Sequence, residues 1–466
     1  MAPPLELGLP FVPGESNVEY FTWPSLPELF PVSFPGVKTS RDDFLVDIDR
    51  DRLVRRLELY FDLAVGHEEM ARIAPGVMDA TARFDPLVTR DRLRKRGFLS
   101  ENVVRYSYRP FDVRWVYWEP ETKLLDEKRA EYFPHVFEGN VWLEARQKQA
   151  MERFDRGYVT RHLADNFGNG LSSFYPLLLD SAALERTLFV SPDHADTRAV
   201  NLSRDAEEWL HIVNGTPPDL FDHVVAILRT PTFSKGNAAA LRQDWPRIPL
   251  PEGRERLLAS AELGRQIAAL LDTETDVPGV TSGAIRPELR AIGAVSRAGG
   301  GALNPDAGDL TVTVGWGHGG KGGITMPGKG RIVERDYSSD ELDALSAGVG
   351  ALGLTVEETL AHLGATTRDI YLNDVAYWRN VPAGVWSYTI GGYQVMKKWL
   401  SYRERSLLGR DLSKDEVREV MNMARRIAAI LLLEPALDAN YRAVTATTWA
   451  SDRGPELGGA RCGEPA

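Results

Sequence analysis

The chain has 466 residues, of which 43% are hydrophobic and 26% are charged, so it can bury a sizeable core and is expected to be globular. Its formal net charge of −11 argues against a protein that coats nucleic acid indiscriminately, because such binding depends on neutralising phosphates, although a local basic face is compatible with it. The one cysteine, Cys462, excludes an internal disulfide framework, and no signal-like or membrane-spanning run occurs, so we expect a cytoplasmic protein without a membrane partner.

The first part of the chain predicts an arm that leads into a helix. Residues 1–35 are rich in proline and aromatic residues, which favours an extended segment lying on a surface. Residues 36–43, GVKTSRDD, form a polar turn, and a helix is expected to start near Asp49 because Leu53 and Leu57 recur on one face.

Residues 106–118 are rich in alternating aromatic side chains, which predicts two strands around a proline turn. Two arginines in this segment, Arg109 and Arg114, have two interpretations. Either guanidinium can donate to guanine O6 and N7 together, or it can form an ion pair with Asp112 within the fold. We expect both strands to belong to an N-terminal α/β lobe over residues 36–232.

The second part of the chain predicts another lobe and a connector. Residues 233–275 form the connecting helical segment, because they contain an amphipathic helix at Arg254–Leu271. A C-terminal α/β lobe is expected over residues 276–440, ending in a packing helix from Lys414 to Leu433. Residues 441–466 are predicted to be a disordered tail. The fold class is therefore mixed α/β (α+β), with two lobes joined by a helix and a helical C-terminus.

The stretch from Gly384 to Arg410 combines basic and aromatic residues at close spacing. A strand is expected before the glycine pair, and a helix over Tyr393–Arg405 whose Trp399 faces the core. This helix is either a solvated basic helix with aromatic residues in the core, or a surface that clamps phosphates. Its cations are Lys397, Lys398, Arg403 and Arg405.

Two patterns imitate catalytic motifs but are incomplete. GWGHGGKG, residues 315–322, fits a phosphate-binding loop except that Gly322 stands where Ser or Thr must bind Mg²⁺, which favours a flexible or DNA-proximal loop. Asp112 with Glu121 and Lys123 has the spacing of a metal-dependent nuclease, a pattern short enough to occur by chance.

The motif of an amino-methyltransferase is missing too. Such an enzyme needs an Asn/Asp-Pro-Pro-aromatic turn that holds the target amine and stacks on the flipped base. Pro217–Pro218 lies in TPPDL, with no aromatic residue after it. The eight histidines, His223 among them, show no metal-ligand spacing and are expected to be structural. We therefore expect no active site and no metal or cofactor site in this chain.

Five stretches match one known family in the order in which they occur. They are WPSLPELFPVSFPGVKTSRDDF (23–44), YRPFDVRWVYW (108–118), DWPRIPLP (244–251), YLNDVAYWRNVPAGVW (371–386) and GVWSYTIGGYQVMKKWLSYRERSLLGR (384–410). Together they resemble the target-recognition region of type ISP restriction-modification enzymes, which are single-chain DNA methyltransferase-translocase-nucleases. The segment GVKTSRD resembles the family's GxKTxRD, where a helix-capping loop and a role in seating DNA or the methyltransferase domain both stay open.

The resemblance implies a subunit or fragment that recognises duplex DNA and lacks its own catalytic domain. In the family this region follows the methyltransferase domain, so we expect a separately encoded methyltransferase, translocase and nuclease subunit as partner. S-adenosylmethionine, ATP and Mg²⁺ are expected only in that partner. Two alternatives are a fragment of an adenine-specific DNA methyltransferase or nuclease with an unrecognised active site, and a non-catalytic interaction scaffold. The resemblance and the residue types suggest DNA contacts from Lys38, Arg41, Arg109, Arg114, Lys397, Lys398, Arg403 and Arg405.

Overall fold

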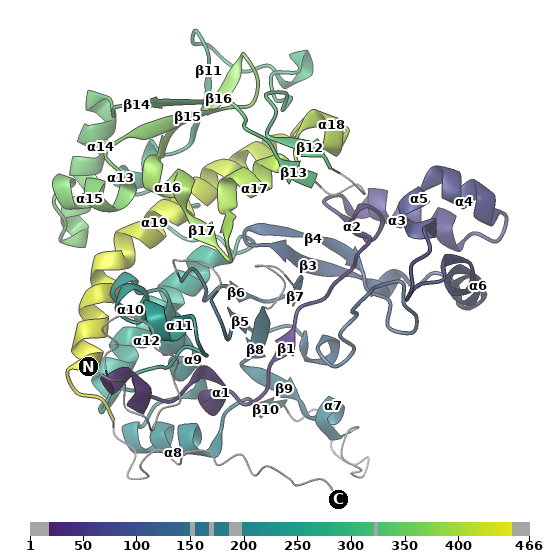
Figure 1. The fold of residues 1–466 in the computed structure, drawn as a ribbon. Coiled ribbons are helices and arrows are strands. Elements are labelled where there is room, and N and C mark those ends of the chain that lie inside the picture. The colour runs from purple at the N-terminus through teal and green to yellow at the C-terminus, as the bar shows by residue number, and fades with distance from the viewer. Residues whose placement is uncertain (1–17, 150–153, 167–171, 186–197, 321–324, 450–466) are drawn as a thin grey trace, which may run out of the picture.

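The computed structural model describes residues 18–149, 154–166, 172–185, 198–320 and 325–449. Within them, helices and short strands form two lobes, one above the other in Figure 1, and the long helix α19 (Lys414–Thr445) runs along both. The lower, N-terminal lobe contains four-stranded sheets of order β1-β8-β5-β6 and β2-β4-β3-β7, and the upper lobe contains one of order β11-β16-β15-β14. Buried apolar side chains of both lobes form one hydrophobic cluster. The predicted mixed α/β class is confirmed.

The predicted hairpin around the proline turn is present in the N-terminal lobe. It consists of β3 (Val103–Arg109) and β4 (Asp112–Tyr117), which pair antiparallel. Phe111 takes a φ of 63° in the turn, so that Arg109 and Asp112 lie opposite each other at the end of the ladder. This turn is where charged side chains of the lobe reach the second lobe.

The first described residues are packed and helical, unlike the extended arm predicted over residues 1–35. Val18–Thr22 forms a 3-10 helix, and Tyr20 and Trp23 are each 2% exposed. The Arg247 guanidinium donates to the Trp23 carbonyl at 2.7 Å. Val18–Thr22 and α1 (Leu26–Leu29) are therefore helical where an extended arm was predicted, whereas residues 30–35 are not helical and include β1 (Phe34–Pro35); residues 1–17 lie outside the described part of the chain.

Two predicted helices are found where the periodicity placed them. Helix α3 (Arg50–Phe61) begins after Asp49, whose carboxylate accepts from the backbone N–H groups of Asp51 and Arg52. Helix α12 (Arg254–Leu271) has the predicted bounds and packs on α9 (Pro217–Leu228) and α19. At Gly264 an added Cβ would lie 1.8 Å from the Asp222 carbonyl oxygen, so glycine lets the α9 and α12 backbones touch.

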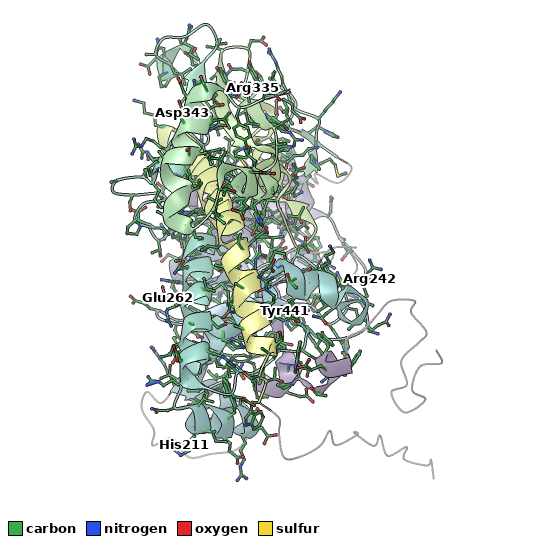
Figure 2. All side chains as sticks on the ribbon, turned by 90° about the vertical axis from the view of Figure 1, so that its left-hand side faces the viewer. His211, Arg242, Glu262, Arg335, Asp343 and Tyr441 are labelled. Atoms are coloured by element: carbon green, nitrogen blue, oxygen red, sulfur yellow. The ribbon has the colours of Figure 1, made fainter. Side chains whose placement is uncertain are left out.

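Helix α19 connects the lobes and is longer than predicted. It begins at a capping box formed by Ser413 and Glu416, and it continues through Pro435. In Figure 2 this yellow helix descends from the level of the upper lobe to Tyr441 near its lower end. Tyr441 is 8% exposed, so the predicted disordered tail starts too early at residue 441; residues 450–466 lie outside the described part.

The upper lobe packs its sheet and a glycine hairpin onto helices. In β16 (Ala376–Pro382) the Trp378 indole donates to the Val417 carbonyl of α19 at 3.2 Å. The hairpin consists of β12 (Gly317–Gly319) and β13 (Thr325–Pro327). A Cβ at Gly317 would lie 1.9 Å from the Ser401 carbonyl oxygen. Glycine is therefore required for this close approach to α17 (Val395–Ser401).

The remaining elements complete both lobes. In the N-terminal half they are α1 (Leu26–Leu29), β1 (Phe34–Pro35), α2 (Asp42–Leu45), β2 (Val46–Asp47), α4 (His67–Ile73), α5 (Pro75–Met78), α6 (Pro86–Arg96), β5 (Trp142–Ala145), β6 (Val159–Thr160), β7 (Leu163–Ala164), β8 (Ser173–Pro176), β9 (Leu178–Asp180), α7 (Ser181–Glu185), β10 (Arg198–Val200), α8 (Arg204–Val213), α10 (Pro231–Gly236) and α11 (Ala238–Leu241). In the C-terminal half they are α13 (Pro287–Arg290), β11 (Ala294–Arg297), β14 (Ile332–Arg335), α14 (Ser339–Val349), α15 (Val356–Leu363), β15 (Thr367–Tyr371), α16 (Ala383–Ser387), β17 (Thr389–Ile390), β18 (Tyr393–Gln394) and α18 (Arg405–Leu408).

Candidate nucleic-acid interface

The basic and aromatic stretch near the end of the chain folds differently from the predicted strand and single helix. Trp386 belongs to the short helix α16, and the strand is reduced to β17, which pairs with β18. Helix α17 then ends at Ser401 with Tyr402 as its C-cap, and α18 is separate from it. The predicted continuous helix over Tyr393–Arg405 is therefore wrong, because the chain turns after α17 and carries Arg403 into the core.

The glycine turn before α17 is held by the other lobe. Gly391 and Gly392 have φ of 61° and 82°, a region that glycine adopts without strain. The Gly391 N–H donates to the Asp155 carbonyl oxygen at 3.0 Å, and the Gly392 N–H donates to Asp155 Oδ2 at 2.8 Å. Asp155 of the N-terminal lobe therefore sets the position from which α17 starts.

Arg403, two residues after α17, forms a buried ion pair with the hairpin of the N-terminal lobe. Its Nη1 and Nη2 lie 3.0 and 2.9 Å from Asp112 Oδ2 and Oδ1, and both side chains are almost fully buried. Arg114 Nη2 lies 2.6 Å from Oδ2 of the same carboxylate. Burial alone would raise the pKa of Asp112, but Arg114 and Arg403 hold it well below its usual range.

A groove of about 1290 Å³ opens between the two lobes. The loop that follows β1, together with β2, contributes one wall, and α17, β18 and β13 contribute the other. The groove brings together five of the eight suggested DNA-contacting residues: Lys38, Arg109, Arg114, Lys397 and Lys398. Its lining also contains tyrosines and several carboxylates, so the groove is polar and of mixed charge.

Most cations that line the groove already have a carboxylate partner. Lys38 Nζ lies 2.9 Å from Asp126, and Arg109 Nη1 lies 2.5 Å from Asp165 Oδ1. Arg52 and Arg56 both pair with Asp47, and Arg114 pairs with Asp112. In the part of the chain that the structure describes, the two groove cations without an ion pair are Lys397 and Lys398 of α17.

Three suggested DNA contacts lie elsewhere. Arg403 is 2% exposed in the ion pair described above, so its assignment to phosphate is corrected to a structural role. Arg41 is 7% exposed and donates to the Leu124 carbonyl at 2.9 Å, so it fixes the loop before α2. Arg405 is exposed and lies 3.4 Å from Asp411, outside the groove lining.

Asp165 is a groove residue that the sequence did not single out. Burial raises its pKa to about 6, despite the opposing charge of Arg109, and Asp42 adds to the rise. Tyr106 donates to its Oδ2 at 2.9 Å. No local signal marks Asp165, because its partners are 56 or more residues away in the sequence.

The incomplete catalytic patterns do not assemble into active sites among the described residues. Both oxygens of Asp112 accept from arginine, and Glu121 lies 3.3 Å from Arg96, so the nuclease-like pattern has no free carboxylate pair. In GWGHGGKG, Gly317–Gly319 forms β12, while Lys321 and Gly322 lie outside the described residues. His223 is buried between Ser260 and the Pro249 carbonyl, as expected for a structural histidine.

Two kinds of feature are absent from the residues that the structure describes. None of their helices combines the length and apolar character needed to cross a bilayer. Their His, Cys, Asp and Glu side chains include no group of three or more arranged to hold a metal ion.

The chain is a two-lobed α/β domain with a groove between the lobes. Comparison with known families identifies the protein family to which it belongs. The family model of the Type ISP C-terminal specificity domain matches residues 28–430. The chain belongs to this family, as the resemblance of the five stretches predicted. Family membership supports a role in DNA target recognition.

Solved structures share the fold at low sequence identity. A DrdV–DNA complex solved by cryo-electron microscopy matches with a TM-score of 0.54 and 17% identity, over 88% of this chain. A nuclease-deletion mutant of the Type ISP restriction-modification enzyme LlaGI with a DNA substrate mimic gives 0.51 and 14% over 91%. The ATP-dependent Type ISP enzyme LlaBIII bound to DNA gives 0.53 and 14% over 91%. The matches cover 36%, 34% and 24% of those chains, respectively. No curated protein sequence matches this chain.

Proposed function

We propose that this chain recognises a duplex DNA target along the groove between its lobes, with α17 bound to phosphates. The observation that carries the proposal is that Lys397 and Lys398 line the groove without an ion pair among the described residues. A cation that already has a carboxylate partner must lose that interaction before it neutralises a phosphate. Lys397 and Lys398 have no carboxylate interaction to lose, so neutralising a phosphate and releasing its counterion costs them no ion pair.

Base readout is assigned to amide groups beside these lysines. Asn166 and Gln394 line the same groove and have the side chains that pair with adenine edges, whereas Arg109 is already paired with Asp165. Asn166 Oδ1 is buried and has no hydrogen-bond partner among the described residues, whereas the Gln394 amide donates to the Trp386 carbonyl at 2.6 Å. Asn166 is therefore the first candidate for reading a base, which requires its side chain to rotate so that the buried Oδ1 faces the groove.

We infer further that methyl transfer, translocation and cleavage belong to a separately encoded partner chain, which alone uses S-adenosylmethionine, ATP and Mg²⁺. In the similar solved proteins the matched region is one part of a larger chain, since it covers 24–36% of their length. Co-purification from the native cells should recover a larger chain with methyltransferase activity. Recovery of this chain alone, or as part of one longer polypeptide, would contradict a separate partner.

Binding of fluorescent duplexes to the purified chain tests the main proposal. A library of random duplexes, selected over several rounds, provides the cognate sequence, and a scrambled duplex of equal length provides the control. We expect salt-dependent binding to both and tighter binding to the selected sequence. Incubation with labelled S-adenosylmethionine should give no methylated DNA. Equal affinity for selected and scrambled duplexes would exclude target recognition, and methyl transfer would favour the alternative of a catalytic fragment.

A further inference from the structure

Three cations and three tyrosines form a closed alternating ring in the groove. Arg114 Cζ lies 4.1 Å from the centre of the Tyr108 ring and 4.2 Å from that of Tyr402. Lys398 Nζ lies 4.8 Å from Tyr402 and 5.5 Å from Tyr393. Arg109 Cζ closes the ring, at 5.6 Å from Tyr393 and 4.0 Å from Tyr108. All these distances lie within the range of cation–π attraction.

Each lobe contributes three members of the ring, and the three from the N-terminal lobe are held in place by carboxylates. Arg109, Tyr108 and Arg114 come from β3 and β4, whereas the other three members come from β18, α17 and the residue after α17. Arg109 is held by Asp165, and the Tyr108 hydroxyl donates to Asp42 Oδ2 at 2.7 Å. Arg114 is held by Asp112, which Arg403 holds in turn.

Lys398 is the member of the ring with no ion pair among the described residues, so it is located by the tyrosine faces. A lysine on a helix surface is otherwise free to rotate, and ordering it on binding reduces affinity. Burial alone would raise the pKa of Tyr402, but Arg109, Lys398 and Arg114 bring it below its usual value. That direction agrees with three positive charges converging around one ring.

We propose that Tyr402 and Tyr393 are positioning residues that hold the Lys398 ammonium in place for a DNA phosphate. This inference rests on the proposed DNA-binding function and adds the residues that pre-organise its main contact. Arg109 and Arg114 of the other lobe help to fix these tyrosines, because their guanidinium groups contact the Tyr393 and Tyr402 rings, respectively. The arrangement makes the lysine an ordered charge at the lobe interface.

The position of Lys398 can be measured without DNA. Reductive methylation with ¹³C labels each lysine as a dimethylammonium group, and the Lys398 signal is assigned from a Lys398→Arg variant. Ring currents of two tyrosines should shift this signal upfield of that of exposed Lys414, which lies outside the groove lining. Tyr402→Phe should retain the shift, and Tyr402→Leu should move the signal towards that of Lys414. An unshifted wild-type signal would overturn the proposal.

DNA binding then separates positioning from a general structural effect. Tyr402→Leu should weaken binding roughly two- to tenfold, the range for ordering one flexible side chain, while Tyr402→Phe stays near wild type. The double variant Lys398→Ala/Tyr402→Leu should bind as weakly as Lys398→Ala and no more weakly. Tyr377→Leu, which removes a ring stacked on Tyr371 outside the groove lining, is the matched control and should leave binding unchanged.

The outcomes separate the positioning role of the tyrosines from the proposed DNA binding itself. If the wild-type chain binds DNA but the two losses add in the double variant, the positioning role is wrong and the proposed function stands. If the wild-type chain shows no salt-dependent binding, the proposed function fails, and the positioning role for a phosphate fails with it, whatever the lysine signal shows. Tyr393→Leu serves as a second ring variant should Tyr402→Leu fail to fold.

Discussion

Arg403 and Asp112 are 291 residues apart in the sequence and form a bidentate, buried ion pair between the two lobes. Replacing Arg403 with alanine leaves part of the Asp112 charge without a partner in the core. We expect Arg403→Ala to lower the free energy of unfolding by about 3–5 kcal/mol, measured by urea denaturation. Arg405→Ala removes an exposed cation and should change it by at most about 1 kcal/mol. Equal losses in both variants would show that the buried pair contributes little.

Lys398 should contact phosphate without reading sequence. Lys398→Ala is expected to weaken binding about equally on selected and scrambled duplexes and to reduce the salt slope by roughly one unit. Asn166→Ala should instead cost about 1–3 kcal/mol on the selected duplex only, because it removes a base contact. Anisotropy titrations at several salt concentrations measure both effects. A Lys398→Ala loss confined to the selected duplex would mean that α17 reads bases.

Trp399 should prove to be a packing residue. It is 1% exposed, its indole donates to Glu419 Oε1 at 3.1 Å, and the Arg403 guanidinium lies 3.7 Å from its ring centre. Trp399→Ala should lower the free energy of unfolding by about 3–5 kcal/mol, since it leaves a cavity in the core. Trp115→Ala, at a partly exposed position, should cost less. Thermal or urea unfolding of the two variants tests whether Trp399→Ala loses more stability than Trp115→Ala.

His223 should make the fold sensitive to acid. Burial lowers its pKa from 6.5 to about 4, and the imidazole contacts the Ser260 hydroxyl and the Pro249 carbonyl. Because the folded-state pKa lies below the unfolded value, its stabilisation is complete above pH 6.5 and is lost as the pH falls towards 4. The loss should be about 3 kcal/mol. Unfolding of wild type and His223→Gln at pH 4 to 7 should show a flatter dependence in the variant.

Asp165 should make DNA binding stronger in mild acid. Its pKa of about 6 means that the carboxyl becomes protonated as the pH falls from 7.5 to 5. Protonation removes the negative charge that balances Arg109, so the groove gains positive potential towards phosphate. Affinity of the wild-type chain should therefore rise over this range, and Asp165→Asn should bind at pH 7.5 as the wild type binds at pH 5. If the DNA affinity of Asp165→Asn still rose with falling pH as in the wild type, another titrating group would be responsible for the rise.

Several elements could be predicted from the sequence because they depend on neighbouring residues. Apolar spacing and capping side chains act within four positions, which explains the bounds of α12, the start of α3 after Asp49 and the start of α19 after Ser413. The β3–β4 hairpin follows from alternation around a proline turn. The arm prediction missed the helices at Val18–Thr22 and Leu26–Leu29, because the burial of Tyr20 and Trp23 there depends on residues far along the chain, such as Arg247.

The sequence by itself determined the family, the two α/β lobes and the presence of a basic, aromatic stretch near the end of the chain. Only the tertiary structure decided which cations face the groove. Arg403 and Lys398 are five positions apart in that stretch, yet one is buried on Asp112 and the other lies over two tyrosine rings without an ion pair among the described residues. The physical reason is that a charge is placed by the groups that compensate it: Arg403 is held by Asp112 of the other lobe, whereas Lys398 contacts Tyr393 and Tyr402 of its own stretch.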